Sequence, residues 1–143
     1  MSARSLFLFL LIVCLPVSAW SEIARVKKVS GDAWVERAGQ RVEAKPGVTL
    51  EQRDVLVTGT GRLSVTFIDN SRFSAGPNSR VSLERFEFDA TTHEGAFETR
   101  LERGSLAVVS GQIAKQTPDA MKLRTPTSIL GVRGTRFIVE VPQ

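Results

Sequence analysis

The feature that most constrains the fold of this chain is the frequency of its turn signals. Residues that favour turns recur about every 8–12 residues, for example Pro-Gly at 46–47, Asp-Asn-Ser at 69–71 and Gly-Pro-Asn-Ser at 76–79. Between them lie short runs that alternate apolar and polar residues, most clearly 62–68. Only 110–120 weakly suggests a helix. The pattern therefore predicts an all-β fold.

The strands expected from this alternation are short and evenly spaced. A polar loop is expected at 89–96, a break at Arg103-Gly104 and a strandless linker at 126–135. Short strands at regular spacing favour a β-roll or β-solenoid-like domain, with a β-sandwich as the alternative. The expected strands are 23–29, 33–37, 41–44, 54–58, 62–68, 72–75, 81–88, 97–102, 105–109, 121–125 and 136–141.

The N-terminal segment differs from the rest of the chain. Arg4 precedes an apolar run at 6–15, which is followed by small residues up to Ala19. This order is typical of a secretory signal peptide, and the run is shorter than the roughly 20 residues that a membrane span requires. We expect a signal peptide at 1–21, cleaved after Ala19 or Ser21, and an all-β domain at 22–143. The mature chain is then periplasmic or otherwise exported and does not span the membrane.

Cysteine and charge exclude several classes of function. The single cysteine, Cys14, lies in the signal segment, and the bulky Val13 before it argues against lipid attachment. Without Cys14 the mature domain has no disulfide, thiolate nucleophile or cysteine metal ligand. The net charge is +4, but the basic residues are scattered among acidic ones rather than gathered in a patch with aromatics. We therefore expect no nucleic-acid partner.

Five segments, taken in order, resemble the FecR-domain family of bacterial periplasmic domains. They are 31–47, 53–59 (similar to G-D-x-[IVL]-x-T-G), 63–81 (similar to x-L-x-D-G-S and L-x-P-N-S), 101–106 and 123–137 (similar to T-P-x-x-x-x-x-V-R-G-T-x-F). The chain departs from the pattern at Arg53 and Asn70, where the family usually has Gly. The family-motif residues, which we interpret as structural, are Gly31, Gly47, Asp54, Thr58, Asp69, Ser71, Asn78, Ser79, Gly104, Thr125, Pro126, Val132, Gly134 and Phe137.

The resemblance implies an all-β fold and a role in extracytoplasmic sensing. The best-known members regulate sigma factors through a cytoplasmic domain, a membrane helix and a further domain that contacts an outer-membrane transporter. We do not recognise those parts in this sequence, so the resemblance does not extend to sigma-factor regulation. What it implies is a periplasmic domain that binds a partner or ligand.

The side chains predict no catalytic or metal site and no cofactor. His93, the only histidine, lies in the polar loop without further ligands near it in sequence. Asp54 and Asp69 could form a carboxylate pair, but a role in turns is favoured for both. Trp34 and Phe67 are expected in the core.

The strongest candidate for ligand or partner binding is the loop that contains Arg133 and Thr135. A guanidinium, a flexible glycine and a hydroxyl together suit a carboxylate or phosphate, although a structural role for this loop is favoured. Two classes of function remain open. One is a non-enzymatic sensing or binding module of envelope signalling, with an unknown envelope protein or small ligand as partner. The alternative is a structural or assembly factor for envelope or surface components. The oligomeric state is not predicted.

Overall fold

The computed structural model describes residues 21–143, and it contains twelve strands and one short helix in that range. The expected signal peptide, apart from Ser21, and Cys14 lie outside the described residues. Strands β1 to β9 form one sheet in the order β3-β2-β5-β8-β9-β7-β6-β1-β4, to which β10, β11 and β12 are added. The expected all-β class is confirmed.

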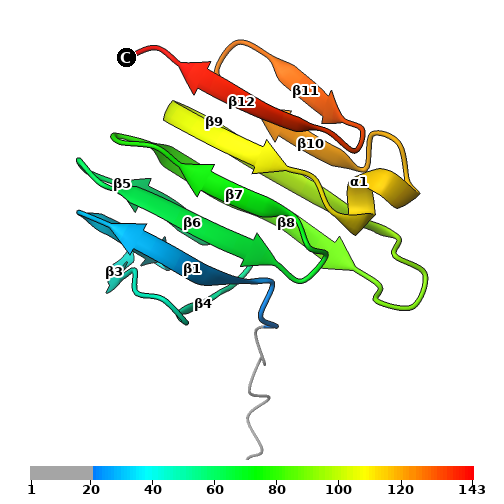
Figure 1. Ribbon diagram of the computed structural model, residues 1–143, viewed down its shortest axis with the longest axis horizontal. Coiled ribbons are helices and arrows are strands. Elements are labelled where there is room, and N and C mark those ends of the chain that lie inside the picture. Colours follow the sequence, from blue (N-terminus) through cyan, green and yellow to red (C-terminus); the bar gives the residue numbers. More distant parts are fainter. Residues whose placement is uncertain (1–20) are drawn as a thin grey trace, which may run out of the picture.

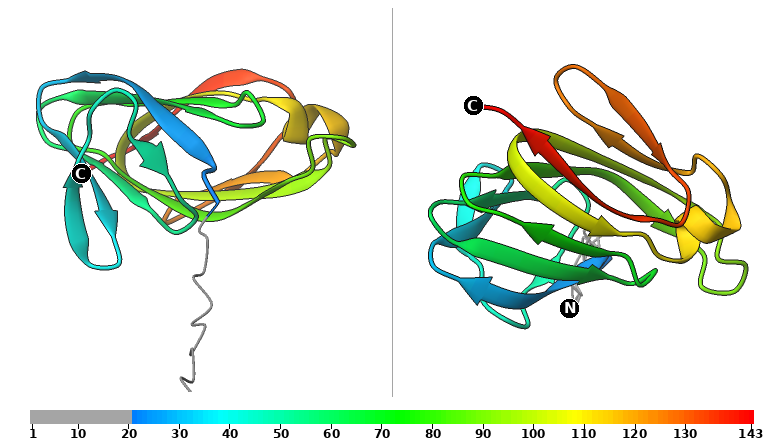
Figure 2. Two further views of the ribbon diagram at one scale, coloured as in Figure 1. Left: turned by 90° about the horizontal axis from the view of Figure 1, so that it is seen from below. Right: turned by 45° about the horizontal axis from the view of Figure 1, so that its top comes forward.

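The sheet curls strongly, so that its two halves face each other across the core (Figures 1 and 2). We call them the β6 half and the β8 half. The β6 half contains β1 (Ala24–Ser30), β4 (Thr49–Leu50), β6 (Arg62–Phe67), β7 (Arg72–Ala75) and β12 (Arg136–Val141). The β8 half contains β2 (Ala33–Arg37), β3 (Gln40–Glu43), β5 (Val55–Thr58), β8 (Arg80–Phe88), β10 (Met121–Arg124) and β11 (Ile129–Val132).

The long strand β9 (Gly95–Val109) belongs to both halves. Its first part pairs with β8 and β10, and its last part pairs with β7 and β12. All pairs in the sheet are antiparallel except β9 with β10. This mainly antiparallel order describes a rolled half-barrel rather than the stacked parallel coils of a solenoid.

Aromatic side chains join the two halves in the core. Phe67 from the β6 half lies with its ring centroid 4.7 Å from that of Phe73 and 4.6 Å from that of Phe97. Phe86 from the β8 half lies 4.8 Å from Phe97. All four rings are buried, so each half covers apolar area on the other. The expectation that Phe67 belongs to the core is confirmed.

Helix α1 (Gln112–Gln116) falls inside the segment that weakly suggested a helix. It lies at one end of the curled sheet, where Ile113 and Ala114 are buried (Figure 1). The polar loop at 89–96 is also confirmed, with β8 ending at Phe88 and β9 beginning at Gly95.

Three expectations about the strands and the core are wrong. The break expected at Arg103-Gly104 is instead a β-bulge inside β9. Arg80 pairs with Arg103 and Val81 with Leu101, so β9 has one more residue than β8 at this point, and Gly104 takes φ +88°. The expected linker at 126–135 contains β11, which forms a hairpin with β10. Trp34 is half-exposed because it lies on the outer face of β2, where the Arg41 guanidinium covers its ring at 3.8 Å.

Candidate functional site

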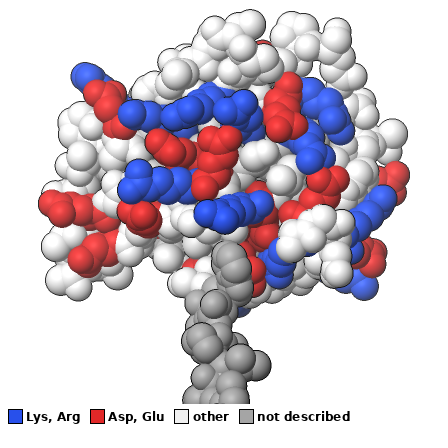
Figure 3. Space-filling view, turned by 180° about the vertical axis from the view of Figure 1, so that it is seen from behind, with Lys and Arg blue, Asp and Glu red and all other residues white. Residues whose placement is uncertain are grey.

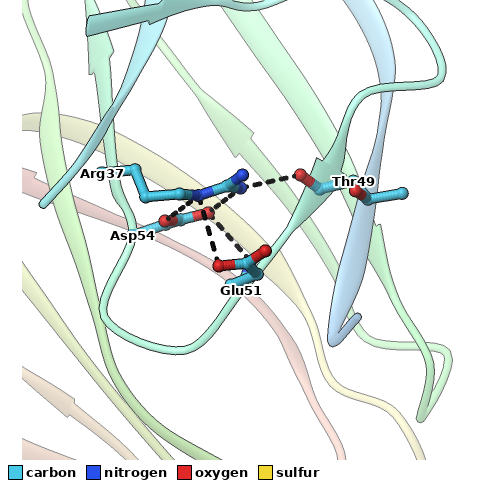
Figure 4. Close-up of polar contacts among 4 residues, drawn as sticks. All are labelled: Arg37, Thr49, Glu51 and Asp54. Atoms are coloured by element: carbon cyan, nitrogen blue, oxygen red, sulfur yellow. Dashed lines mark hydrogen bonds and ion pairs between the residues drawn. The ribbon is translucent and has the colours of Figure 1, made fainter. Parts of the chain in front are cut away.

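The family-motif residue Asp54 anchors the loop between β4 and β5. Its buried carboxylate accepts two hydrogen bonds from Arg37, at 2.9 and 2.7 Å, and one from the Glu51 amide at 2.8 Å (Figure 4). Arg37 also donates to the Thr49 carbonyl at 3.0 Å. The hydrogen bond to Asp54 raises the pKa of the Arg37 guanidinium. Asp54 is therefore a structural anchor and not an acid or base at an open site.

The preceding residue, Arg53, occupies a position where the resemblance to the FecR-domain family predicts glycine. Its φ is +75°, in the left-handed region that costs an L-residue roughly 1–2 kcal/mol. Asn70, the second departure from the family pattern, has φ +68°, which asparagine tolerates better. Both turns are thus preserved with residues other than glycine.

A second buried anchor holds the β6–β7 turn against α1. The carboxylate of Asp69 accepts from the Ser71 amide at 3.0 Å and from the Ser71 hydroxyl at 2.8 Å. The Ser71 hydroxyl in turn accepts from the Gly111 amide at 2.9 Å. The favoured role of Asp54 and Asp69 in turns agrees with these contacts, which hold each carboxylate in its own turn.

A third anchor lies where β9 bulges. Thr58 donates its hydroxyl to the Gly76 carbonyl at 2.6 Å and accepts from the Ser79 amide at 2.9 Å. The Ser79 hydroxyl donates to the Ser105 carbonyl at 3.0 Å and accepts from the Ser105 amide at 2.9 Å. A Cβ on Gly104 would collide with the Ser79 side chain. These residues tie the end of β5 to the turn before β8, and that turn to β9 at its bulge.

The other motif residues occupy turns or the core. Thr125 accepts from the Ser128 amide at 3.0 Å and closes the β10–β11 turn that contains Pro126. Val132 is buried on β11, and Phe137 packs on the core from β12. Four of these remaining motif residues lie in turns with positive φ, namely Gly31 (+69°), Gly47 (+93°), Asn78 (+55°) and Gly134 (+64°).

The predicted binding loop is exposed but is not joined by other functional groups. Arg133 has 71% of its side chain exposed, and its one ion pair is to Asp119 at 3.4 Å. The Thr135 main chain is fixed, because its carbonyl accepts from the Ser110 amide and hydroxyl, each at 3.1 Å. The loop leads directly into β12.

The outer edge of β12 was not recognised as a binding feature from the sequence. Within residues 21–143, β12 pairs with β9 alone and β11 with β10 alone. The hydrogen bond from the Ser110 amide to the Thr135 carbonyl identifies which residue pairs of β9 and β12 are hydrogen-bonded, because hydrogen-bonded and non-hydrogen-bonded pairs alternate in antiparallel strands. The residues that consequently direct their main-chain groups away from β9 are Arg136, Ile138 and Glu140.

Apolar side chains accompany these free edges. Ile138 on β12 is 69% exposed, and Ile129 on β11 is 66% exposed. Both edges lie on the same side of the molecule (Figures 1 and 2). Unpaired main-chain groups beside exposed apolar residues are what an added strand recognises. The alternation at 136–141 indicated a strand, but whether that strand had one neighbour or two depended on distant pairing.

Neither a metal centre nor a membrane helix is found in the described part of the chain. No cluster of three or more potential metal ligands occurs there. No helix there has the length and apolar character needed to cross a membrane. His93 is half-buried in the 89–94 turn, where its ring stacks on Phe88 with a centroid distance of 6.0 Å.

Comparison with known proteins gives one match. A family model described as FecR protein matches residues 54–143, which is more than half of the chain. The match begins at Asp54, so the similarity proposed for 31–47 lies outside it. No significant match was found among curated proteins or among solved structures.

Proposed function

This chain belongs to the FecR protein family, and from that premise we propose that it is a binding module of the bacterial envelope that recognises an extended strand of a partner protein along β12. The FecR domain is associated with regulatory sensing in envelope signalling, and the family is generally non-catalytic. The signal-like segment at 1–21 supports placement outside the cytoplasm.

The free edge of β12 is the observation that carries the proposal. Arg136, Ile138 and Glu140, which are alternate residues of β12, direct their main-chain donors and acceptors outward at the spacing that a neighbouring strand requires. Ile138, in the centre of the three, is also the most exposed large apolar residue in the described chain. A strand added here gains main-chain hydrogen bonds and covers Ile138.

The Arg133 loop would then flank the incoming strand. Arg133 and Thr135 precede β12 directly, and the single contact of Arg133 to Asp119 involves two exposed side chains. Such an exposed ion pair contributes little to stability, so Arg133 is free to exchange Asp119 for a carboxylate of the partner. The loop thereby adds charge selectivity to main-chain recognition.

A proline substitution separates main-chain recognition from side-chain recognition. The Ile138 amide points away from β9, so Ile138→Pro removes the central donor of the edge and leaves the β9–β12 ladder intact. The matched control Ile138→Thr keeps the donor and the β-branched shape. A photo-cross-linking residue at Glu140 reports the partner in cells that express the full chain, with the same residue at Ser82 on the β8 half as control.

We expect a specific cross-link from position 140 and none from position 82. Ile138→Pro should abolish the cross-link, Ile138→Thr should retain most of it, and Arg133→Ala should weaken it. Equal loss with Pro and Thr, in variants that melt like the parent, would refute recognition through the main chain. Because an assembly factor could use the same edge, the identity of the cross-linked protein decides between a signalling role and the alternative assembly role.

A further inference from the structure

The outer face of the β6 half carries a groove that the edge of β12 does not explain. It has a volume of about 450 Å³ and crosses β1, β6, β7, β9 and β12. Small and hydroxyl-bearing residues form its floor, while Lys28, Ile138 and Glu140 stand around it. The floor residues are Ser30, Ser64, Ser74, Gly76, Ser105 and Ala107.

Strand register brings the floor together from distant parts of the sequence. Ser64 is paired with Ser74 across β6 and β7, and their hydroxyl oxygens lie 3.0 Å apart. Ser74 is paired with Ala107, and Ala107 with Ile138. This row of small side chains crosses three strands before the taller Ile138, which produces the hollow.

Four cations without acidic partners line this hollow and the one beside it. Lys28 and Arg62 line the first hollow, and Arg72 and Arg136 line the second, which shares Ser74, Ala107 and Ile138 with the first. Lys28, Arg62, Arg72 and Arg136 are exposed, and none forms an ion pair within residues 21–143. Arg72 and Arg136 are both paired with Val109 from opposite sides, so one strand separates them and their backbones stand about 10 Å apart. Arg62 lies two residues along β6 from Ser64, on the opposite side of the hollow.

Acidic groups on this face are few. Arg25 is paired with Glu22 at 3.0 Å, away from the floor. Glu140 lies at the groove, opposite Ser105 on β9. A carboxylate among the cations disfavours a polymer with closely spaced negative charges, such as a nucleic acid, but accepts hydrogen bonds from sugar hydroxyls.

We propose that this groove and the adjoining hollow together bind an acidic polysaccharide whose carboxylates pair with Arg62 and Arg72 and whose hydroxyl groups bond the serine row. Each sugar unit of such a polymer carries hydroxyl groups beside its carboxylate, which matches a row of serines flanked by cations. The recessed serine floor argues against a membrane surface, which requires protruding apolar side chains. Ile138 and Glu140 border both this groove and the free edge of β12, but Arg62 and Arg72 lie on β6 and β7, so replacing them tests the groove without altering the main chain of the edge.

Titration calorimetry of the full chain with polygalacturonate tests the proposal, with uncharged dextran as the neutral polymer. We expect binding to polygalacturonate and none to dextran. The double variant Arg62→Gln/Arg72→Gln should weaken binding roughly 25-fold, as two exposed charge contacts of about fivefold each. The matched control Arg85→Gln/Arg100→Gln makes the same change in net charge on the β8 half and should alter the affinity by less than about twofold.

Three outcomes would overturn the proposal. Equal weakening by both double variants would show attraction to net charge alone. Tighter binding of duplex DNA or of phosphatidylglycerol vesicles than of polygalacturonate, at one ionic strength, would assign the face to another class of polyanion. Absence of polygalacturonate binding in low salt would exclude the glycan. Ser74→Val, which removes a floor hydroxyl without altering charge, should also weaken binding and would not affect nonspecific attraction.

Discussion

On the outer face of the β8 half, ion pairs join most of the arginines to acidic side chains, whereas four cations on the outer face of the β6 half form no ion pair within residues 21–143. On the β8 half, Arg80 pairs with Glu36 at 2.7 Å and with Glu102 at 2.8 Å, and Arg100 pairs with Glu84 at 2.9 Å. Figure 3 shows this face from behind, with basic and acidic side chains interleaved across the strands. The outer faces of the two halves thus differ in how many of their basic side chains have an acidic partner in the protein.

The difference indicates which surface is available for an external anion. Cross-strand pairs of opposite charge stabilise a sheet face directly, so the β8 face has little to gain from a ligand. On the β6 face, serine and alanine occupy the positions opposite one another, and the cations stand apart from acidic groups. Such a face gains less stability from cross-strand charge pairs and leaves its cations accessible to an external anion.

The largest expected effect concerns Gly104, where β9 passes from one half to the other. Both Gly104 and Gly134 have positive φ, but only Gly104 lacks room for a Cβ, because the Ser79 side chain lies against it. We expect Gly104→Ala to lower the free energy of unfolding by about 3 kcal/mol or more, and Gly134→Ala by about 1 kcal/mol. Urea denaturation of both variants measures the difference. Equal losses would mean that the close packing at the bulge does not hold the halves together.

A smaller effect on stability is expected when one arginine from each face is replaced by methionine. Arg80→Met leaves Glu36 and Glu102 without their shared partner and should lower the free energy of unfolding by about 1 kcal/mol. Arg72→Met removes a cation without an ionic partner in the described chain and should change it by less than about 0.5 kcal/mol. Denaturation in low salt gives both values. If Arg72→Met is the more damaging variant, the contrast between the faces is wrong.

The smallest effect is the pH dependence of the β8 face. The hydrogen bond from Arg80 lowers the pKa of Glu36 below its ordinary value of 4.5. The ionised pair therefore contributes stability above that value, and the contribution is lost as the pH falls through the lower pKa of the folded state. Between about pH 6 and about pH 3, the parent should lose slightly more stability than Arg80→Met. Identical pH profiles of the two proteins would exclude a contribution from this pair.

Local sequence patterns predicted where the strands lie better than they predicted which strands pair with each other. The alternation of apolar and polar residues located β6 and β7, and residue types that tolerate positive φ indicated the turns at Asn70 and Gly47. β11 was missed because Gly131 interrupts a short apolar run after Pro126, and its strand conformation depends on pairing with β10. The bulge at Gly104 resembled a break, since a glycine that bends a strand and one that ends it have the same local sequence.

The candidate surfaces were less predictable than the fold. The Arg133 loop was identified as a candidate binding loop because its arginine, its glycine and its place between strands are local features. The cations of the groove escaped notice because Lys28 and Arg136 are far apart in the chain and meet only through the β1–β6–β7–β9–β12 register. Basic residues that look scattered in the sequence thus include four that gather on one face of the folded chain.

The membership of β9 in both halves also has a kinetic consequence. Every route from the β6 half to the β8 half through paired strands passes along residues 95–109, so neither half can complete its ladder until this segment has docked. Pairing between segments distant in sequence slows folding, because the intervening chain loses entropy before the contacts form. Formation of β9 is thus expected to be the rate-limiting event, with both halves consolidating in a single cooperative transition rather than one after the other.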